Sequence, residues 1–263
     1  MNNTFSNKFI ADEKNLKLLK ETMWGPNGIR QAEELASYFT ITADMQILDL
    51  GCGPGLSSIY LAQEYEAKVF ATDLFADPTE NYERFKSLGI EDKTIPMTLD
   101  ATHPVPFAKG YFDVIFSVGA YNMFGLDENM LTHLSAYVKN GGYIAVSFPG
   151  LKKDFGDNVP PEMKPFFEVK EVDKYIRGID WWKKLWSNAD GIKIINISGQ
   201  VCHDIAWKEY LANLDPDKED EKWDLDMMEA EGGKYFNTIQ LIAKVIGYKE
   251  RKNPLERLLK KSF

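Results

Sequence analysis

From Met45 onward, short apolar runs rich in β-branched and aromatic residues alternate with longer stretches in which apolar residues recur at helical spacing. This alternation is typical of βαβ units, in which a helix connects each strand to a parallel neighbour. It predicts an α/β fold with a doubly wound, mainly parallel sheet of seven strands and helices on both faces. The expected strands are residues 45–50, 68–73, 94–99, 112–118, 141–148, 192–199 and 236–246.

The predicted helices lie between these strands and before the first of them. A chain of 263 residues is long enough to bury one large core, so we expect a single domain over residues 1–263. Residues 1–40 supply N-terminal helices, and residues 150–190 and 200–235 are expected to be insertions that cover a ligand site. The expected helices are residues 8–22, 28–39, 55–65, 78–88, 127–138 and 170–187.

The charge balance limits the partners of the chain. It has 31 Lys and Arg against 40 Asp and Glu, a formal net charge of −9. Binding to a phosphate backbone depends on clustered basic residues, so nucleic acid is not an expected partner. Cys52 and Cys202 have neither disulfide-framework nor zinc-ligand spacing, and no metal is expected.

The sequence also lacks the usual membrane signals. No apolar run approaches the about 18 residues of a membrane span, and the first residues lack the features of a signal peptide. We therefore expect a cytoplasmic protein without stable membrane association. The oligomeric state stays open.

Residues 46–55 combine the pattern of a buried strand with a glycine-rich turn that opens a helix. Glycine admits positive φ and lets a ligand approach the backbone without a Cβ in the way. Asp49, at the carboxyl end of the strand, can accept hydrogen bonds or attract a cation. The next strand ends in Asp73, 18 residues after Gly55, where a carboxylate can bind both hydroxyls of a ribose.

A nicotinamide-dependent oxidoreductase is the main alternative for such a turn. The dinucleotide fingerprint requires Gly or Ala where this sequence has Leu56. Asp49 lies two residues before the first glycine, where it would repel a pyrophosphate but suit a cationic ligand. Both residues favour a sulfonium cofactor over a dinucleotide.

On these motifs the sequence resembles the class I S-adenosylmethionine-dependent methyltransferases. Their acidic-x-Gly-x-Gly-x-Gly turn is present as Asp49 to Gly55, and their acidic end of the second strand as Asp73. Asp100 follows the third strand, and an aspartate-led fourth strand spans 112–117. The resemblance implies the Rossmann-like methyltransferase fold and S-adenosyl-L-methionine as cofactor.

The resemblance covers about residues 30–150 and includes a turn at 138–143 before the fifth strand, with Asn140 where the family usually has Pro. It is greatest with the branch that methylates small molecules, alongside quinone and sterol methyltransferases. The expected partner is thus a small-molecule acceptor. The absence of an Asn-Pro-Pro-Tyr motif after the fourth strand also argues against methylation of nucleic acid.

Carried over residue by residue, the resemblance implies a complete cofactor site. The glycine turn would hold the methionine moiety, Asp73 would bind the ribose and Leu74 would pack on the adenine. Asp100 and Ala101 would meet the adenine amino edge. The implied cofactor-binding residues are Asp49, Gly51, Cys52, Gly53, Gly55, Asp73, Leu74, Asp100, Ala101 and Ser117.

Methyl transfer from a sulfonium is an in-line displacement, in which the protein mainly aligns the reactants and excludes water. The acceptor atom can belong to a thiol, hydroxyl, amine or carbon, and a protein base is optional. Tyr121 follows the fourth strand and His203 follows the sixth, so both are candidate catalytic residues. For each, the alternative is a purely structural role. A non-catalytic module that binds S-adenosylmethionine is an alternative for the whole chain.

Tryptophans outside the glycine turn are further candidates. Trp24 lies in a turn with Gly and Pro, where it can either shape the turn or close over a ligand. Residues 150–187 are rich in aromatic side chains, which belong either to the core or to an acceptor site. Trp181 and Trp182 are the residues of this segment that we single out for ligand contact.

Overall fold

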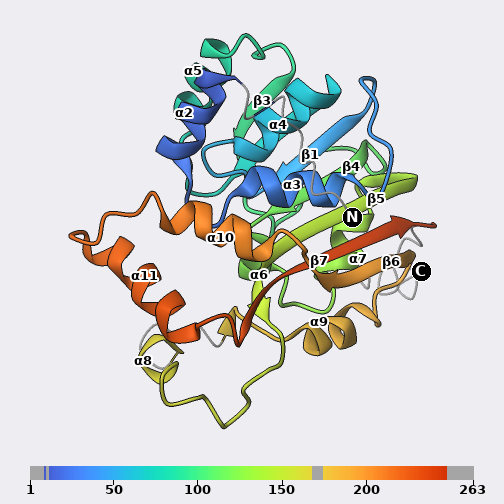
Figure 1. Cartoon of the computed structure of the whole chain (residues 1–263). Helices are drawn as coiled ribbons and strands as arrows, with labels where there is room; N and C mark the ends of the chain where they lie inside the picture. The colour runs from blue at the N-terminus through green and yellow to red at the C-terminus, as the bar shows by residue number, and fades with distance from the viewer. Residues whose placement is uncertain (1–8, 10–11, 168–173, 248–263) are drawn as a thin grey trace.

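The structure is a computed structural model that describes Phe9, residues 12–167 and residues 174–247. Within these residues, seven strands form one sheet in the order β3-β2-β1-β4-β5-β7-β6 (Figure 1). The strands are β1 (Gln46–Leu50), β2 (Lys68–Asp73), β3 (Thr94–Thr98), β4 (Phe112–Val118), β5 (Val138–Leu151), β6 (Ile192–Gly199) and β7 (Phe236–Val245).

The sheet is mainly parallel and doubly wound. Strands β1 to β5 pair in parallel, whereas β7 runs antiparallel to both of its neighbours, β5 and β6. The strand order reverses between β1 and β4, so the connections leave in opposite directions there. The predicted fold class and all seven strands are confirmed.

Helices flank the sheet on both faces, also as predicted. The helix predicted at 127–138 is too long, since α7 ends at Ser135 and the amide of Phe112 donates to Tyr137 O at 2.9 Å, which ties residue 137 to the sheet. The helix predicted at 170–187 begins too early, since α9 starts at Ile179, and residues 8, 10–11 and 170–173 of the predicted helices lie outside the described residues. The helices are α2 (Glu13–Thr22), α3 (Gly28–Ala36), α4 (Leu56–Tyr65), α5 (Pro78–Ser87), α6 (Tyr121–Phe124), α7 (Met130–Ser135), α8 (Lys164–Phe167), α9 (Ile179–Trp186), α10 (His203–Leu211) and α11 (Glu219–Glu231).

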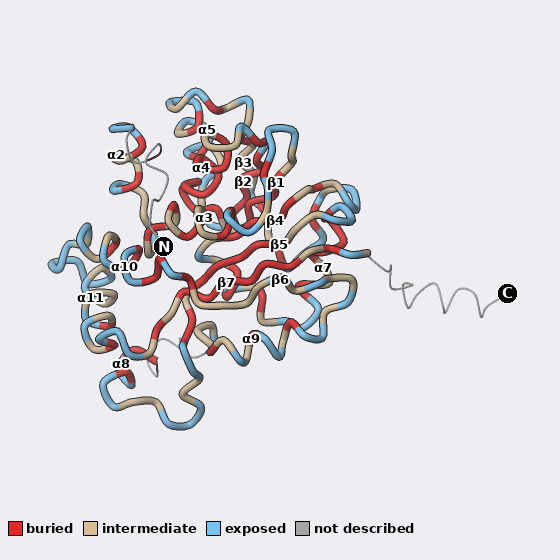
Figure 2. Tube along the Cα trace, turned by 45° about the vertical axis from the view of Figure 1, so that its right-hand side comes forward, coloured by how far each residue is buried: buried red, intermediate tan, exposed pale blue. Residues whose placement is uncertain are grey.

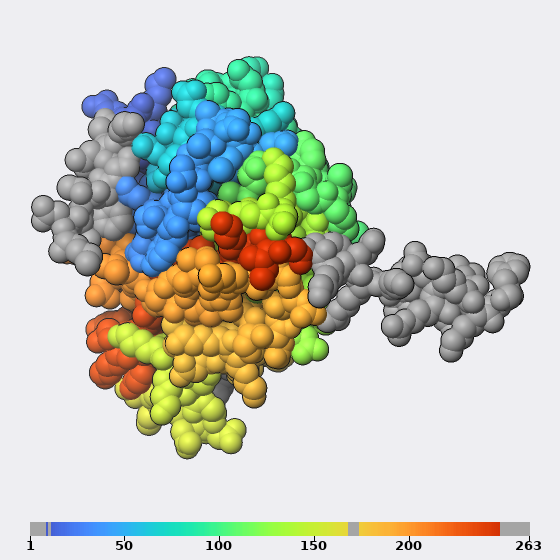
Figure 3. All heavy atoms as spheres, turned by 90° about the vertical axis from the view of Figure 1, so that its right-hand side faces the viewer, coloured from blue at the N-terminus to red at the C-terminus, as the bar shows by residue number. Residues whose placement is uncertain are grey.

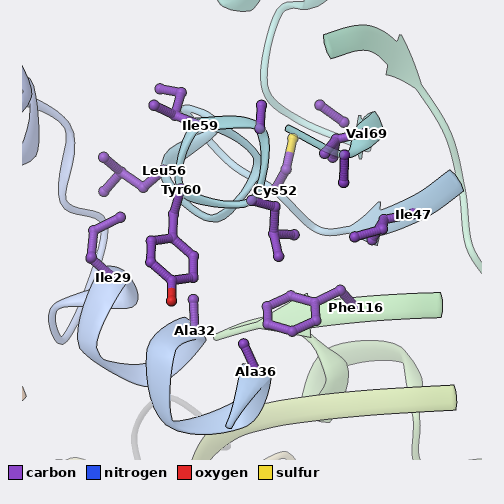
Figure 4. Packing of buried hydrophobic residues seen from close by; sticks show 14 of the residues in the cluster. Ile29, Ala32, Ala36, Ile47, Cys52, Leu56, Ile59, Tyr60, Val69 and Phe116 are labelled. Carbon is purple, nitrogen blue, oxygen red and sulfur yellow. The ribbon is translucent and has the colours of Figure 1, made fainter. Parts of the chain in front are cut away.

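Two buried clusters lie on opposite faces of the sheet. In β1, Ile47 belongs to the cluster under α3 and α4, and Leu48 belongs to the cluster under α7 and α9. Successive side chains of a strand point to opposite faces, so a strand covered by helices on both sides is apolar throughout. Figure 4 shows Tyr60 of α4 and Ala32 and Ala36 of α3 on the same side of the sheet as Phe116 of β4.

Helices α8, α10 and α11 lie together beside one end of the sheet (Figure 1) and share a third buried cluster with Leu151 and Phe236. This region contains the predicted insertion 200–235. Trp223 of α11 packs edge-on against Phe166 with ring centroids 5.1 Å apart, as expected for a helix that packs with one face. Much of the outer surface of α11 is exposed (Figure 2).

Segments distant in sequence hold α3 in place. Glu34 accepts hydrogen bonds from the amides of Val201 and Cys202, both at 2.9 Å. Asn196 of β6 donates to the hydroxyl of Tyr38 at 3.3 Å. In Figure 3 the blue segment that contains α3 accordingly lies against the orange segment near residue 200. Helix α3 therefore joins the sheet to the region of α10.

The described part of the chain lacks two kinds of feature. None of its helices is both long and apolar enough to cross a membrane. No group of three or more His, Cys, Asp or Glu side chains there is arranged to hold a metal ion.

Candidate functional site

A cavity of about 530 Å³ opens at the carboxyl ends of the parallel strands, where the strand order reverses between β1 and β4. Ligands of doubly wound sheets bind at this place, and the volume suits a small molecule. We call the part lined by residues 50–54, 56–57, 73–75 and 99–102 the acidic half, and the part lined by residues 22–26, Gly28, Gln31, 118–120, 123–124, Pro149 and Tyr175 the apolar half.

The glycine turn after β1 needs its glycines for close packing. Gly51 has φ 72°, and a Cβ at this residue would lie 2.2 Å from the Cβ of Ala120 in the loop after β4. Gly55 has φ 89°, and its Cβ would lie 2.7 Å from the Phe85 ring. Glycine tolerates both conformations without a steric penalty. Gly51 and Gly53 line the cavity and Gly55 does not, so the structure gives Gly55 a packing role.

The amides of this turn are bonded within the protein. The amides of Gly51 and Cys52 both donate to Thr72 O, at 2.8 and 3.0 Å. The Gly53 amide donates to Asp73 Oδ2 at 2.8 Å, and the Gly55 amide donates to Cys52 O at 2.9 Å. A pyrophosphate site needs such amides to point at the ligand. Because these four amides are bonded within the protein, they do not form a pyrophosphate site.

Asp49 lies behind the turn and does not line the cavity. Its Oδ2 accepts hydrogen bonds from the hydroxyls of Ser57 and Ser58 in the first turn of α4, both at 2.6 Å, and its Oδ1 is buried without a partner. Burial raises the pKa of this carboxyl to about 6, although the two hydroxyl bonds oppose the shift. Asp49 thus fixes the turn to α4 and adds negative charge beneath the cavity.

Asp73 is the carboxylate that joins the turn to the cavity wall. Its Oδ2 accepts from Gly53, and its Oδ1 accepts from the amides of Phe75 and Ala76 at 2.8 and 3.0 Å. The residue lines the cavity at the end of β2, with Leu74 and Phe75 beside it. Phe75 is 87% exposed, which leaves an apolar face open at the rim.

Asp100 and Ala101 line the same half, next to the end of β3. The Asp100 carboxylate accepts from the amide and hydroxyl of Thr102 at 2.8 and 2.6 Å, and lies 2.9 Å from His103 Nδ1. The Thr102 bonds and then the contact with His103 lower the pKa of Asp100. This half therefore presents two carboxylates, Asp73 and Asp100, to a ligand.

Of two further residues predicted to bind the cofactor, Cys52 lies at the cavity and Ser117 does not. Cys52 lines the cavity, and burial raises the pKa of its thiol well above the usual range. Ser117 is fully buried in β4, where its hydroxyl donates to Leu50 O at 2.7 Å, and does not line the cavity. The lining residue at the end of β4 is Val118, because adjacent residues of a strand face opposite sides.

The apolar half is formed mainly by hydrocarbon and aromatic side chains. Trp24 is 67% exposed at the rim, and its ring lies next to the backbone of Gly53. Met123 and Phe124 of α6 line the half, and Tyr175 closes it from the far segment. The position of Trp24 fits a role in covering a ligand.

The turn that carries Trp24 is fixed to α10. Glu209 of α10 pairs with Arg30 through both carboxylate oxygens, one of them 2.6 Å from Arg30 Nε, and accepts from Asn27 Nδ2 at 2.7 Å. The backbone N–H of Asn27 also donates to Ala206 O at 3.1 Å. Arg30 and Asn27 are largely buried, so this charged pair holds the cavity wall against α10.

Neither candidate catalytic residue lines this cavity. Tyr121 is fully buried among Phe148, Trp182 and Trp186, and its hydroxyl accepts only a long bond of 3.4 Å from Trp186 Nε1. Burial raises the pKa of this phenol. The sequence-based expectation placed Tyr121 facing the acceptor. The structure corrects this, because the side chain is buried in the core away from the cavity. Trp181 and Trp182 also belong to this buried cluster and do not line the cavity.

His203 lies in a second, more open hollow between α10 and α11, with Trp207 and Glu231. Its Nδ1 is 3.0 Å from Thr238 Oγ1, and burial lowers the pKa of the imidazole. The expectation of His203 at the acceptor site is therefore corrected as well. The reason is the strand order, since β7 separates β6 from β5.

Met123 and Tyr175 are lining residues that the sequence did not indicate. Met123 follows the strand-four motif by a few residues, but the direction of its side chain depends on the turn of α6. Tyr175 lies in the segment after β5, and its carbonyl accepts from Asn122 Nδ2 at 3.4 Å. No sequence signal identifies this long-range contact.

Comparison with known proteins agrees with this geometry. Residues 47–142 match the family model described as a methyltransferase domain. The methyltransferase GfsG of Streptomyces halstedii is 26% identical over 121 residues, which are 46% of this chain and 43% of that protein. A sarcosine/dimethylglycine N-methyltransferase of Halorhodospira halochloris is 28% identical over 116 residues, 44% of this chain and 42% of that protein. The chain matches less than half the length of either relative.

A solved structure shows the fold over a longer range. Geranyl diphosphate C-methyltransferase from Streptomyces coelicolor A3(2), in complex with Mg²⁺, geranyl-S-thiolodiphosphate and S-adenosyl-L-homocysteine, superposes with a TM-score of 0.66. The superposition covers 82% of this chain and 75% of that chain at 16% sequence identity. At this identity the likeness concerns the fold.

The structure is a doubly wound α/β fold with a cavity at the carboxyl ends of its parallel strands, the place where ligands of this fold bind. Through residues 47–142 the chain is similar to methyltransferases, and the solved structure that shares its fold was determined with S-adenosyl-L-homocysteine bound.

Proposed function

We propose that this protein transfers a methyl group from S-adenosylmethionine to a small-molecule acceptor. The observation that carries the proposal is the acidic half, where Asp73 and Asp100 line a cavity whose glycine turn keeps its own amides bonded internally. Carboxylates suit the hydroxyl, amino and ammonium donors of a cationic cofactor. A pyrophosphate would meet negative charge and find the amides of Gly51, Cys52, Gly53 and Gly55 bonded within the protein, which disfavours the nicotinamide alternative.

The residues of the acidic half fit the cofactor, and each has a distinct task. Asp73 would bind the ribose hydroxyls, with Leu74 and Phe75 packed on the adenine. Asp100 and Ala101 would meet the adenine amino edge. The glycine turn would hold the methionine moiety, with Asp49 acting from behind it. When bound, the cofactor supplies an electrophilic methyl group on a positively charged sulfur, so the chain need only align the acceptor and exclude water.

We further propose that residues 150–190 and 200–235 belong to the same single domain and form the acceptor-side cover. Tyr175 supports this for the first segment, because it lines the apolar half. Glu209 supports it for the second, because it anchors the turn of Trp24. A cytoplasmic location fits the two buried, unpaired cysteines, and the net charge of −9 argues against nucleic acid.

The test is calorimetric titration of the purified protein with S-adenosylmethionine, S-adenosylhomocysteine and NAD, followed by methyl transfer to small acceptors. We expect binding of the first two ligands and none of NAD. Binding without transfer to any acceptor would favour a non-catalytic module. NAD binding with no response to the other two ligands would overturn the proposal.

A further inference from the structure

Given the proposed function, we propose that the acceptor is a small apolar thiol without an anionic group, which the protein methylates without a general base of its own. The proposal rests on the composition of the apolar half. Its described lining includes Met23, Trp24, Pro26, Val118, Met123 and Phe124.

Charge is the first criterion. No Lys, Arg or His is present among the described residues that line the cavity, and its charged residues are Asp73 and Asp100. A carboxylate or phosphate on the acceptor would lose water, meet two like charges and find no counterion in this lining. Glu209 pairs with Arg30 outside the cavity lining. The cavity therefore selects against anionic acceptors.

The absence of a suitable base in the described lining is the second criterion. Asp73 and Asp100 lie in the acidic half and already accept several hydrogen bonds each. Burial keeps the Cys52 thiol protonated by raising its pKa. Tyr175 carries the remaining ionisable side chain of the described lining, and it offers a phenol hydroxyl, not a carboxylate or an imidazole.

The neutral polar side chains of the apolar half are also engaged within the protein. Thr22 donates its hydroxyl to Leu18 O at 2.7 Å. Gln31 donates to Pro26 O at 3.0 Å and accepts from the Ser147 hydroxyl at 3.3 Å. They do not supply a base, and they leave the half suited to hydrocarbon.

These two criteria decide among a thiol, an alcohol and an amine as the reacting group. An alcohol keeps its proton at neutral pH and needs a base, and an alkylamine is protonated there and must first lose that proton. A thiol ionises near pH 8.5, roughly, so a few per cent of it is already the nucleophilic thiolate.

The thiol proton passes to water before the reaction. The thiolate electron pair then forms the bond to the methyl carbon as the bond from that carbon to the sulfonium sulfur breaks. The products are a methyl thioether and S-adenosylhomocysteine, whose sulfur no longer carries a charge, so charge and atoms balance without another reactant.

The first experiment measures binding alone, by calorimetry on protein saturated with S-adenosylhomocysteine. Benzyl mercaptan and 4-(mercaptomethyl)benzoic acid share a ring and a thiol and differ in one carboxylate. We expect the neutral thiol to bind at least about tenfold more tightly, a free-energy difference of about 1.4 kcal/mol. Equal or tighter binding of the acid would overturn the charge criterion.

A pair of variants tests where the selectivity arises. Met123→Lys adds a cation at the half-exposed rim of the apolar half. It should reduce the affinity ratio between the neutral thiol and the acid by up to about fivefold, the limit for an exposed ion pair. Met123→Gln has similar length without charge and should leave this affinity ratio unchanged. If the lysine variant behaves as the glutamine variant does, the acceptor does not occupy the apolar half.

The second experiment measures transfer to benzyl mercaptan, benzyl alcohol and benzylamine. We expect the thiol alone to react well, with kcat/KM rising about tenfold per pH unit below the thiol's own pKa, because the thiolate fraction rises in that way. Faster transfer to the alcohol or amine would overturn the thiol assignment and leave methyl transfer intact. No transfer to any of the three, with cofactor bound, would overturn the acceptor class. Failure to bind the cofactor would instead contradict the proposed function.

Discussion

Replacement of Asp49 by Asn should make the folded protein more stable near neutral pH. The Asp49 carboxyl is fully buried, with one oxygen lacking a partner, and its pKa rises from about 3.9 in an unfolded chain to about 6 in the fold. Between these values the folded state binds more protons than the unfolded state, so stability falls as pH rises through this window. A difference of about two in pKa corresponds to a loss of about 3 kcal/mol in the free energy of unfolding. This destabilisation by the ionised Asp49 carboxylate is complete above about pH 6 and absent below about pH 4.

Urea unfolding of the wild type and Asp49→Asn at pH 4 and pH 7.5 checks this sign and magnitude. The stability of the variant relative to the wild type should rise by about 3 kcal/mol between the two pH values, because the amide does not titrate. Terms that do not depend on pH, such as the unpaired amide hydrogens of Asn, cancel in this comparison. Asp77→Asn, at an exposed helix N-cap, is the control for loss of one acidic charge. A pH-independent difference for Asp49→Asn, or one that shrinks toward neutral pH, would refute the reasoning.

Three other variants separate the parts of the site. Asp73→Ala should weaken S-adenosylmethionine binding at least about tenfold by calorimetry, whereas Asp77→Ala removes the same charge nearby and should not; equal affinities would reject the ribose role. Glu209→Gln should cost about 1 kcal/mol of stability and raise the acceptor KM while cofactor affinity stays unchanged, because Glu209 anchors the turn of the apolar half. Tyr121→Phe loses only a long bond in the core, so turnover should stay at the wild-type level, and a large drop in kcat would restore Tyr121 as a catalytic candidate.

The elements of the fold could be predicted because their signals are local. Strand β1 and its turn are recognisable within residues 46–55, and the buried strands alternate with helical stretches of ordinary length. The helix predicted at 127–138 failed at its end because Tyr137 bonds to Phe112, a partner that the local spacing of apolar residues does not reveal. Helices α10 and α11 lie in a segment whose packing partner, the third buried cluster, is formed by residues far away in sequence.

The two misplaced catalytic candidates have separate physical causes. His203 follows a strand end, but β7 enters the sheet between β5 and β6 and carries that strand end away from the cavity. Tyr121 follows the right strand, but the short helix α6 directs its ring into the core and leaves Met123 at the cavity. Strand order and the direction of a single turn are set by the whole packing, so neither could be read from residues near the motif.

The two halves of the cavity also differ in whether they depend on local sequence or on contacts between distant residues. The acidic half is built from residues at or shortly after the ends of β1, β2 and β3, and its carboxylates accept from amides two or three residues away and, for Asp73, from the amide of the neighbouring glycine turn. The apolar half depends on contacts across the chain, such as that between Asn27 and Glu209, 182 residues apart. Its shape can therefore change through the covering segments without disturbing Asp73 or the glycine turn. For this reason the cofactor followed from the sequence motifs, whereas the acceptor class had to be argued from the charge and hydrogen bonding of the assembled wall.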